Sequence, residues 1–231
     1  MKKRKRAGIA ADLFIIFVIA ALYALTSGGD AVSTVSALYA GPVYRGSSED
    51  SVALEIAVSW DANAVQDMLD TLKKYGVHAT FALSGEYAQT QPALARRIAD
   101  EGHEIATMGF DPSFDGDAAA VRADIAESLA AIKKAADVSP VLYYSGERET
   151  APSARAARRL GLTHVLCTLD LRCARGTAED IMKRGLNEPL AGSIILMQPT
   201  RAGADALAGL IEGFLAKGIR VTTVSAVTDP G

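Results

Sequence analysis

The chain has 231 residues, of which 49% are hydrophobic and 6% aromatic, and its formal net charge is −3. This length allows one domain of ordinary size together with a targeting segment. Five of the 24 basic side chains lie in residues 2–6, so the remainder carries 19 basic against 27 acidic side chains. Nucleic-acid binding needs phosphate neutralisation and often base stacking, so an acidic body with few aromatic rings argues against a nucleic-acid partner.

The N-terminus carries a membrane-targeting pattern. The basic cluster precedes an apolar run over residues 7–25 that only Asp12 interrupts. Roughly 20 apolar residues span a bilayer, and basic residues stay on the cytoplasmic side. We therefore expect residues 1–26 to form a cytoplasmic basic cluster and a single transmembrane helix in the cell membrane, with the rest of the chain outside. A cleaved signal peptide is the alternative, because small residues follow the run.

Residues 27–50 are rich in Ser, Gly, Ala and Thr, which predicts a tether with a short strand near residues 42–44. A domain over residues 51–228 follows, in which strand-like and helix-like segments alternate. The predicted strands are residues 52–60, 77–83, 104–108, 141–145, 163–169, 193–197 and 220–224. The predicted helices are residues 64–75, 92–101, 117–136, 152–160, 178–186 and 204–217. Alternation of this kind indicates parallel βα units, and both an open doubly wound sheet and a barrel fit it.

Histidine and cysteine placement gives no metal pattern. We expect His78 and His164 to be exposed and His103 to have a structural role at the start of a strand. Cys167 and Cys173 are the only cysteines, and their spacing allows either a local disulfide or two free thiols. Active sites of parallel α/β folds form at the carboxyl ends of the strands, so the chemistry must lie there.

Three segments resemble motifs of a known family. They are residues 71–81 (TLKKYGVHATF), 98–105 (IADEGHEI) and 192–198 (GSIILMQ). In this order they resemble the polysaccharide deacetylase, or NodB-homology, family over about residues 42–227. The resemblance implies an α/β fold, a distorted (β/α)7 barrel of parallel strands, and metal-dependent removal of acetyl groups from envelope glycans. The segment 57–62 is most similar to a sporulation-associated subgroup, which also has Asp-Ala where other members have Asp-Asp.

The resemblance also assigns the metal positions, and most of them are replaced. Asp61 keeps the general-base position, but Ala62 stands where a metal carboxylate would be. Met108 replaces the first metal histidine, and the second falls at Asp111 or in a gap. Alanine and methionine supply neither the carboxylate oxygen nor the imidazole nitrogen that an ion such as zinc needs. We therefore expect no metal cofactor.

The groups that would assist the reaction are replaced as well. By resemblance, Leu142 stands for the arginine that orients the catalytic acid, and Cys173 for the aspartate that tunes the general acid. Gln198 stands for the general acid itself. The family reaction needs a metal to polarise the acetyl carbonyl and an acid to protonate the leaving amine. We expect essentially none of this reaction to remain.

Other polar residues at the strand ends define a possible cleft. Tyr143 and Tyr144 could give it an aromatic surface suited to sugar rings, with one of the two pointing into the core. Asp170 ends another predicted strand, and we expect Glu147 and Arg148 to lie in a solvated loop.

Asp111 has two interpretations. It either converges with Asp61 on a rebuilt site or takes part in ordinary loop chemistry, with Asp115 or Asp117 capping the next helix.

The leading hypothesis is a degenerate, outward-facing deacetylase-like protein that binds N-acetylated envelope glycan or an envelope protein. The alternative is an active metal-dependent carbohydrate N-deacetylase with a site rebuilt around Asp61 and Asp111. A third hypothesis is a purely structural envelope protein whose cleft is filled by its own side chains, Met108 and Phe110.

Overall fold

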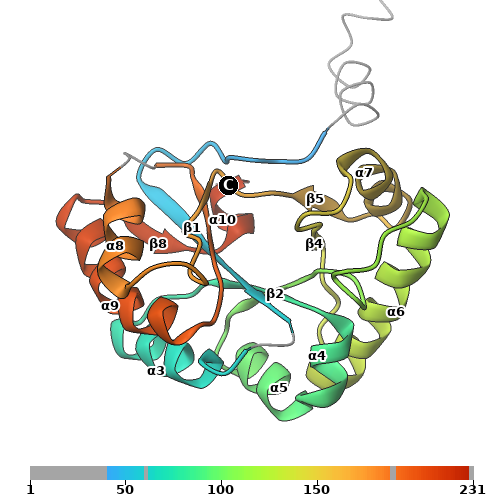
Figure 1. Cartoon of the computed structure of the whole chain (residues 1–231), viewed down its shortest axis with the longest axis horizontal. Helices are drawn as coiled ribbons and strands as arrows, with labels where there is room; N and C mark the ends of the chain where they lie inside the picture. The colour runs from blue at the N-terminus through green and yellow to red at the C-terminus, as the bar shows by residue number, and fades with distance from the viewer. Residues whose placement is uncertain (1–40, 60–61, 188–190, 229–231) are drawn as a thin grey trace, which may run out of the picture. The chain divides into compact units, whose positions relative to one another are not determined.

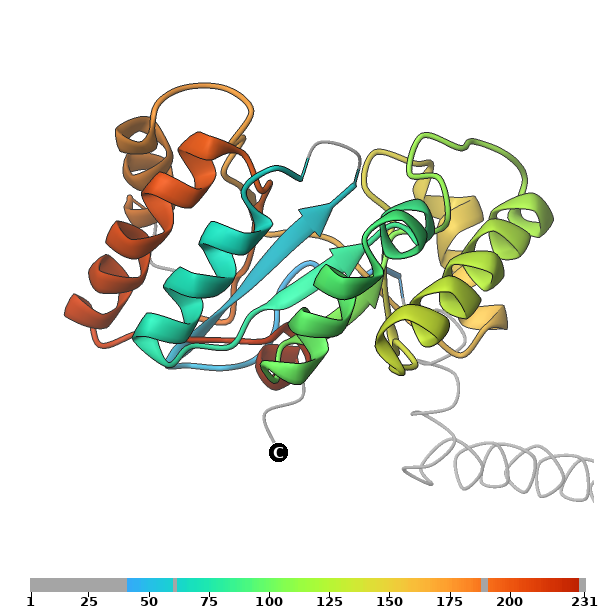
Figure 2. The same cartoon turned by 90° about the horizontal axis from the view of Figure 1, so that it is seen from below.

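The chain folds into a curled sheet of parallel strands, with helices α3 to α9 packed around its outer face (Figures 1 and 2). The computed structural model describes residues 41–59, 62–187 and 191–228. Within this part of the chain, the strands are β1 (Ser51–Val58), β2 (Thr80–Leu83), β3 (Glu104–Thr107), β4 (Leu142–Tyr144), β5 (Thr163–Val165), β6 (Leu169–Asp170), β7 (Ile194–Met197) and β8 (Arg220–Thr222). Their order is β5-β4-β3-β2-β1-β7-β6, and β8 pairs with the first residues of β1.

The predicted parallel α/β fold is confirmed as this half-barrel, but the described residues form eight strands where the sequence predicted seven. The predicted strand 163–169 is divided into β5 and β6, which lie at opposite ends of the strand order. The segment between them crosses from one edge to the other. Leu166 N–H bonds the Val43 carbonyl, and Thr168 N–H bonds the Ile194 carbonyl, each at 2.8 Å.

The helices are α3 (Val65–Tyr75), α4 (Gly85–Thr90), α5 (Pro92–Asp100), α6 (Ala118–Ala136), α7 (Thr150–Arg159), α8 (Ala178–Leu186), α9 (Arg201–Ala216) and α10 (Val224–Thr228). Six of them lie where the sequence predicted a helix. The short helices α4 and α10 were not predicted, because five or six residues give no helical periodicity. The first of these begins directly at a strand end, where the Ser84 hydroxyl accepts the Tyr87 N–H at 3.1 Å.

Alternation along β1 divides the core into two layers. Leu54 and Ile56 face the helices, whereas Ala53 and Ala57 face the inside of the curl. The inner layer is completed by apolar side chains of the other strands and of α10: Ala82, Ala106, Met108, Leu142, Tyr144, Val165, Ile194, Leu196, Val224 and Val227.

No helix within the described ranges is long and apolar enough to cross a membrane. The predicted transmembrane helix and the predicted tether up to residue 40 lie outside those ranges. The short strand predicted near residues 42–44 is found as two isolated bridges, Val43 with Val165 and Arg45 with Ser193.

Candidate functional site at the strand ends

Met108 and Leu142, the two apolar residues at motif positions, point into the inner layer. Met108 follows β3, and its N–H bonds the Leu83 carbonyl at 2.9 Å. Its side chain is buried beside those of Leu142 and Tyr144. These positions therefore supply packing contacts instead of polar groups. Asp61, the retained acid, lies outside the described residues.

The carboxylate of Asp111 is used within its own loop. It accepts hydrogen bonds from Ser113 N–H at 2.9 Å and from the Ser113 hydroxyl at 2.7 Å. These bonds hold the pKa of Asp111 below its ordinary value. Asp117 caps α6 by accepting from Ala119 N–H and Ala120 N–H, both at 2.9 Å. The predicted helix cap is thus formed by Asp117, whereas the convergence of Asp111 with Asp61 stays a prediction because Asp61 lies outside the described residues.

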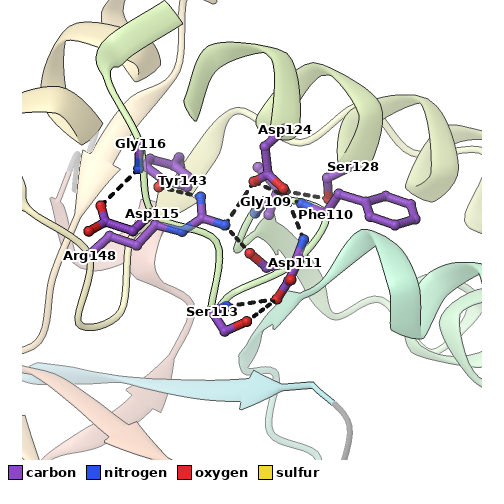
Figure 3. A network of polar contacts seen from close by, with 11 residues as sticks. Gly109, Phe110, Asp111, Ser113, Asp115, Gly116, Asp124, Ser128, Tyr143 and Arg148 are labelled. Atoms are coloured by element: carbon purple, nitrogen blue, oxygen red, sulfur yellow. Dashed lines mark hydrogen bonds and ion pairs between the residues drawn. The ribbon is translucent and has the colours of Figure 1, made fainter. Parts of the chain in front are cut away.

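A buried ion pair fixes the segment after β3, and the prediction of a solvated Arg148 was wrong (Figure 3). The Arg148 guanidinium lies 2.8 Å from Asp124 Oδ2 on α6. It also donates to the Tyr143 hydroxyl at 3.2 Å and to the Asp111 carbonyl. Asp124 further accepts Phe110 N–H at 3.1 Å and Asp111 N–H at 3.0 Å. With so many charge-assisted bonds, the pair offsets much of its desolvation cost.

These interactions also control the charge of Arg148. Burial disfavours the guanidinium charge, but Tyr143 and Asp124 outweigh it and raise the pKa of Arg148 above its ordinary value. No local sequence pattern indicates this pair, because Asp124 and Arg148 lie 24 residues apart on different elements.

Gly109 makes room for the ion pair. Its φ is +87°, and a Cβ there would lie 2.2 Å from Asp124 Oδ2 and 2.6 Å from Arg148 Nη1. The Gly109 N–H bonds Thr107 Oγ1 at 3.1 Å, and that hydroxyl lies 2.8 Å from Ser128 Oγ. Only glycine both adopts this positive φ readily and leaves room for the side chains of Asp124 and Arg148.

A second cluster brings together three of the predicted site residues. Gln198 Oε1 accepts Cys173 N–H at 2.8 Å, and Gln198 Nε2 donates to Asp170 Oδ1 at 3.2 Å. Asp170 Oδ1 also accepts Arg172 N–H at 2.7 Å. The amide thus uses one acceptor and one donor to join the segment after β6 to the end of β7. An ionised carboxylic acid in place of Gln198 could accept from Cys173 N–H but could not donate to Asp170.

Both thiols are free, so the predicted disulfide alternative is not formed. Burial, followed by the charge of Asp170, raises the pKa of Cys167 to about 11. Burial also raises the pKa of Cys173 above its ordinary value. Both side chains are therefore uncharged at neutral pH.

The predicted aromatic surface is absent from the described strand ends, because both tyrosines are buried. Tyr143 packs between β4 and the helices, 5.4 Å from the His164 ring, whereas Tyr144 faces the inner layer. Glu147 is exposed, as predicted.

One of the three histidine predictions was wrong. His164 is buried, with Nε2 2.8 Å from Ser145 Oγ, and burial lowers its pKa to about 4. The predicted structural role of His103 is confirmed, since its Nδ1 accepts Ala79 N–H at 3.3 Å. Burial lowers the pKa of His103 to about 4 as well. His78 is exposed, as predicted.

Glu55 is a buried acid that the sequence reasoning missed. It lies in the middle of β1 with 0% exposure, and neither carboxyl oxygen has a partner within the described part of the chain. Burial, reinforced by Glu104, raises its pKa to about 8. The available signal was an acid within an otherwise apolar strand, since buried glutamates are rare.

A polar hollow of about 460 Å³ opens beside Ala62. Most of its lining groups are neutral hydrogen-bonding side chains. The lining residues are Ser59, Ala62, Asn63, Gln66, Glu86, Tyr87, Thr90, Gln91 and Leu94. Tyr87 is 6% exposed, and its hydroxyl has no partner among the described residues. Burial raises the pKa of Tyr87 to about 12, so the hydroxyl stays protonated and can donate.

No group of three or more His, Cys, Asp or Glu side chains in the described ranges is placed to hold a metal ion.

Comparison with known sequences finds one matching family model and several relatives. The sequence model of the polysaccharide deacetylase family matches residues 45–165. The chain is 29% identical over 195 residues to the uncharacterized protein YlxY of Bacillus subtilis (strain 168), which covers 81% of this chain and 60% of that protein. The chain therefore spans less than two thirds of that relative. It is also 34% identical over 62 residues to the peptidoglycan-N-acetylmuramic acid deacetylase PdaA of B. subtilis, 27% of this chain and 24% of that protein.

Solved structures share the fold. BA3943, a CE4 family pseudoenzyme from Bacillus anthracis, superposes with a TM-score of 0.77 at 23% identity, over 81% of this chain and 69% of that one. The Bc1960 peptidoglycan N-acetylglucosamine deacetylase gives a TM-score of 0.76 at 24% identity, over 84% of this chain and 95% of that one.

Proposed function

Since the chain belongs to the polysaccharide deacetylase family, we propose that it is a catalytically degenerate member that binds N-acetylated envelope glycan without a metal ion. The replaced positions support degeneracy. Met108 and Leu142 pack in the inner layer, and the Gln198 amide is engaged by Cys173 and Asp170. Neither feature supplies a Lewis acid or a proton donor for a leaving amine.

The side chains of the described strand ends do not fit the divalent ion that the family would use. The Asp111 carboxylate turns toward Ser113, and the position of the first metal histidine holds a buried thioether at Met108. Zinc sites need three or four nitrogen, sulfur or oxygen donors at about 2.0–2.3 Å. These side chains therefore support no metal-dependent step.

The observation that carries the binding proposal is the polar hollow beside Ala62. Its volume of about 460 Å³ lies within the roughly 300–1,000 Å³ of small-molecule sites. The uncharged amide and hydroxyl groups of its lining complement the hydroxyl and acetamido groups of an N-acetylated sugar. The Tyr87 ring forms part of the wall, while its hydroxyl is itself shielded from solvent, so the exposed amides of Gln66 and Gln91 are the donors and acceptors that a ligand would meet.

The test measures equilibrium binding of N-acetylglucosamine oligomers to the full chain. We expect saturable binding that weakens in Gln66→Ala and Gln91→Ala, whose amides line the hollow. Gln89→Ala is the matched control, because Gln89 is exposed and lies outside the lining. Equal losses in the control variant, or absence of binding, would contradict the glycan proposal. Stoichiometric zinc together with metal-dependent acetate release would contradict degeneracy and favour the active deacetylase.

The proposal also includes a location. We propose that residues 7–25 anchor the chain in the cell membrane, with the N-terminus in the cytoplasm and the domain outside. The support is the basic cluster that precedes the apolar run. A C-terminal tag should then be cleaved by protease added to intact cells. Protection of the tag in intact cells, with cleavage after lysis, would contradict this orientation.

A further inference from the structure

The charge of the hollow beside Ala62 comes from one acid. Among the described residues, Glu86 is the one charged member of its lining. The other polar members are Ser59, Asn63, Gln66, Tyr87, Thr90 and Gln91. An exposed glutamate is ionised at neutral pH, whereas amides and hydroxyls carry no charge. The described lining therefore presents a negative charge and no basic side chain that would balance it.

The backbone fixes the position of Glu86. This residue lies in the first turn of α4, and its N–H bonds the Phe110 carbonyl at 3.2 Å. The N–H of the preceding residue, Gly85, bonds the Gly109 carbonyl at 3.0 Å. Both bonds tie the start of α4 to the segment after β3. The acid is therefore a constant part of the wall of the hollow.

The arginines of a neighbouring helix do not offset this charge. Helix α5 contributes to the lining, and its arginines are Arg96 and Arg97. Arg96 lies 3.0 Å from Asp100 Oδ1, and Arg97 lies 2.5 Å from Asp70 Oδ1 and 2.9 Å from Glu101 Oε1. Both guanidinium groups are thus already paired. A carboxylate that entered the hollow would lose hydration without gaining an unpaired arginine from α5.

We propose that Glu86 makes the hollow select N-acetylated sugars that carry no carboxylate. N-acetylglucosamine is neutral, whereas N-acetylmuramic acid bears a carboxylate on its lactyl ether. Like charges repel, so Glu86 disfavours the second sugar but not the first. This proposal rests on the proposed glycan binding, because it names the class of sugar that the same hollow accepts.

The experiment compares two probes that differ only in charge. One is the disaccharide of N-acetylglucosamine and N-acetylmuramic acid, and the other is the same disaccharide with its lactyl carboxylate converted to an amide. Both are titrated calorimetrically into the full chain in non-ionic detergent at pH 7 and low salt. We expect the amide to bind roughly 2- to 5-fold more tightly, the range typical of one exposed charge. In 1 M salt the ratio should shrink toward one, because the Debye length falls to about 3 Å.

A series of charges at one position tests whether Glu86 is the cause. Glu86→Gln should bring the ratio of the two affinities to about one, and Glu86→Lys should reverse it. Gln89→Lys is the matched control, because it changes the net charge as Glu86→Gln does, on the same helix but outside the lining. This control should keep most of the ratio. Circular dichroism verifies that each variant folds.

The outcomes separate this proposal from the proposed function. Suppose that N-acetylglucosamine oligomers bind but the acid and amide probes bind equally: glycan binding then stands and charge selection is overturned. Binding of the oligomers but of neither probe would show exclusion by the size of the lactyl group, which also overturns the role of Glu86. A ratio that persists in Glu86→Gln, or that Gln89→Lys removes to the same extent, has the same consequence. Absence of binding by every probe, the oligomers included, contradicts the proposed function and this proposal with it.

Discussion

Glu55 should make the fold less stable as the pH rises through the neutral range. Its pKa is about 8 in the fold against an ordinary value of 4.5, so the folded chain holds a proton that the unfolded chain releases. The stability that depends on this proton is complete below pH 4.5 and is lost progressively up to pH 8. The loss is about 1.4 kcal/mol per pH unit within this window, or about 3 kcal/mol at pH 7.

Two buried histidines act in the opposite direction but at lower pH. The pKa values of His103 and His164 are about 4 in the fold against 6.5 ordinarily. Their contribution is lost as the pH falls toward 4, and it is complete only about one pH unit above 6.5, where the unfolded histidines are fully deprotonated. Between pH 6.5 and 8 the two histidines together still add roughly 0.8 kcal/mol, so the contribution of Glu55 is the difference between the unchanged chain and Glu55→Gln.

The assay is urea unfolding of the full chain, followed by circular dichroism, at several pH values in this window. Between pH 6.5 and 8 we expect the unchanged chain to lose about 1.5 kcal/mol relative to Glu55→Gln. Glu127→Gln, on the exposed face of α6, is the matched control and should keep the full slope. Equal slopes for the unchanged chain and Glu55→Gln would refute the reasoning, as would stability that rises with pH.

Three further variants test the contacts of the strand ends by the same unfolding assay. Arg148→Met leaves Asp124 buried and unpaired and should cost about 3–5 kcal/mol. Arg148→Met with Asp124→Leu should cost less than the sum of the two single variants, and additive losses would contradict the pairing. Gly109→Ala places a methyl group against the ion pair and should cost about 1–3 kcal/mol or more, so an unchanged stability would contradict the fit. Gln198→Glu puts a second carboxylate beside Asp170 and should cost about 1–3 kcal/mol at pH 7, a deficit that shrinks in acid; a deficit independent of pH would contradict it.

Local sequence patterns were sufficient to predict most of the fold. The apolar stripe of α3 and the glycine after it predicted both the helix and its end, and Gly76 indeed caps it with φ +63°. The division of residues 163–169 into β5 and β6 could not be predicted in this way. It depends on Val43 and Ile194, which accept the backbone bonds of that segment from distant parts of the chain.

The replaced residues of the site could be read from the sequence, but their new contacts could not. Strand β4 has three residues, too few for alternation to show that Tyr143 and Tyr144 are both buried on opposite faces. The pairing of Arg148 with Asp124 depends on how α6 packs against the turn after β4. Long-range contacts of this kind leave no periodic signal.

Three of the positions that depart from the family motifs have a structural role, namely Met108, Leu142 and Gln198. Met108 and Leu142 fill the inner layer, where a histidine or an arginine would bury a polar group among apolar neighbours. The Gln198 amide satisfies a donor and an acceptor at once, which an ionised acid cannot do. Restoring a single family residue would therefore remove a packing or hydrogen-bond contact before it added a ligand.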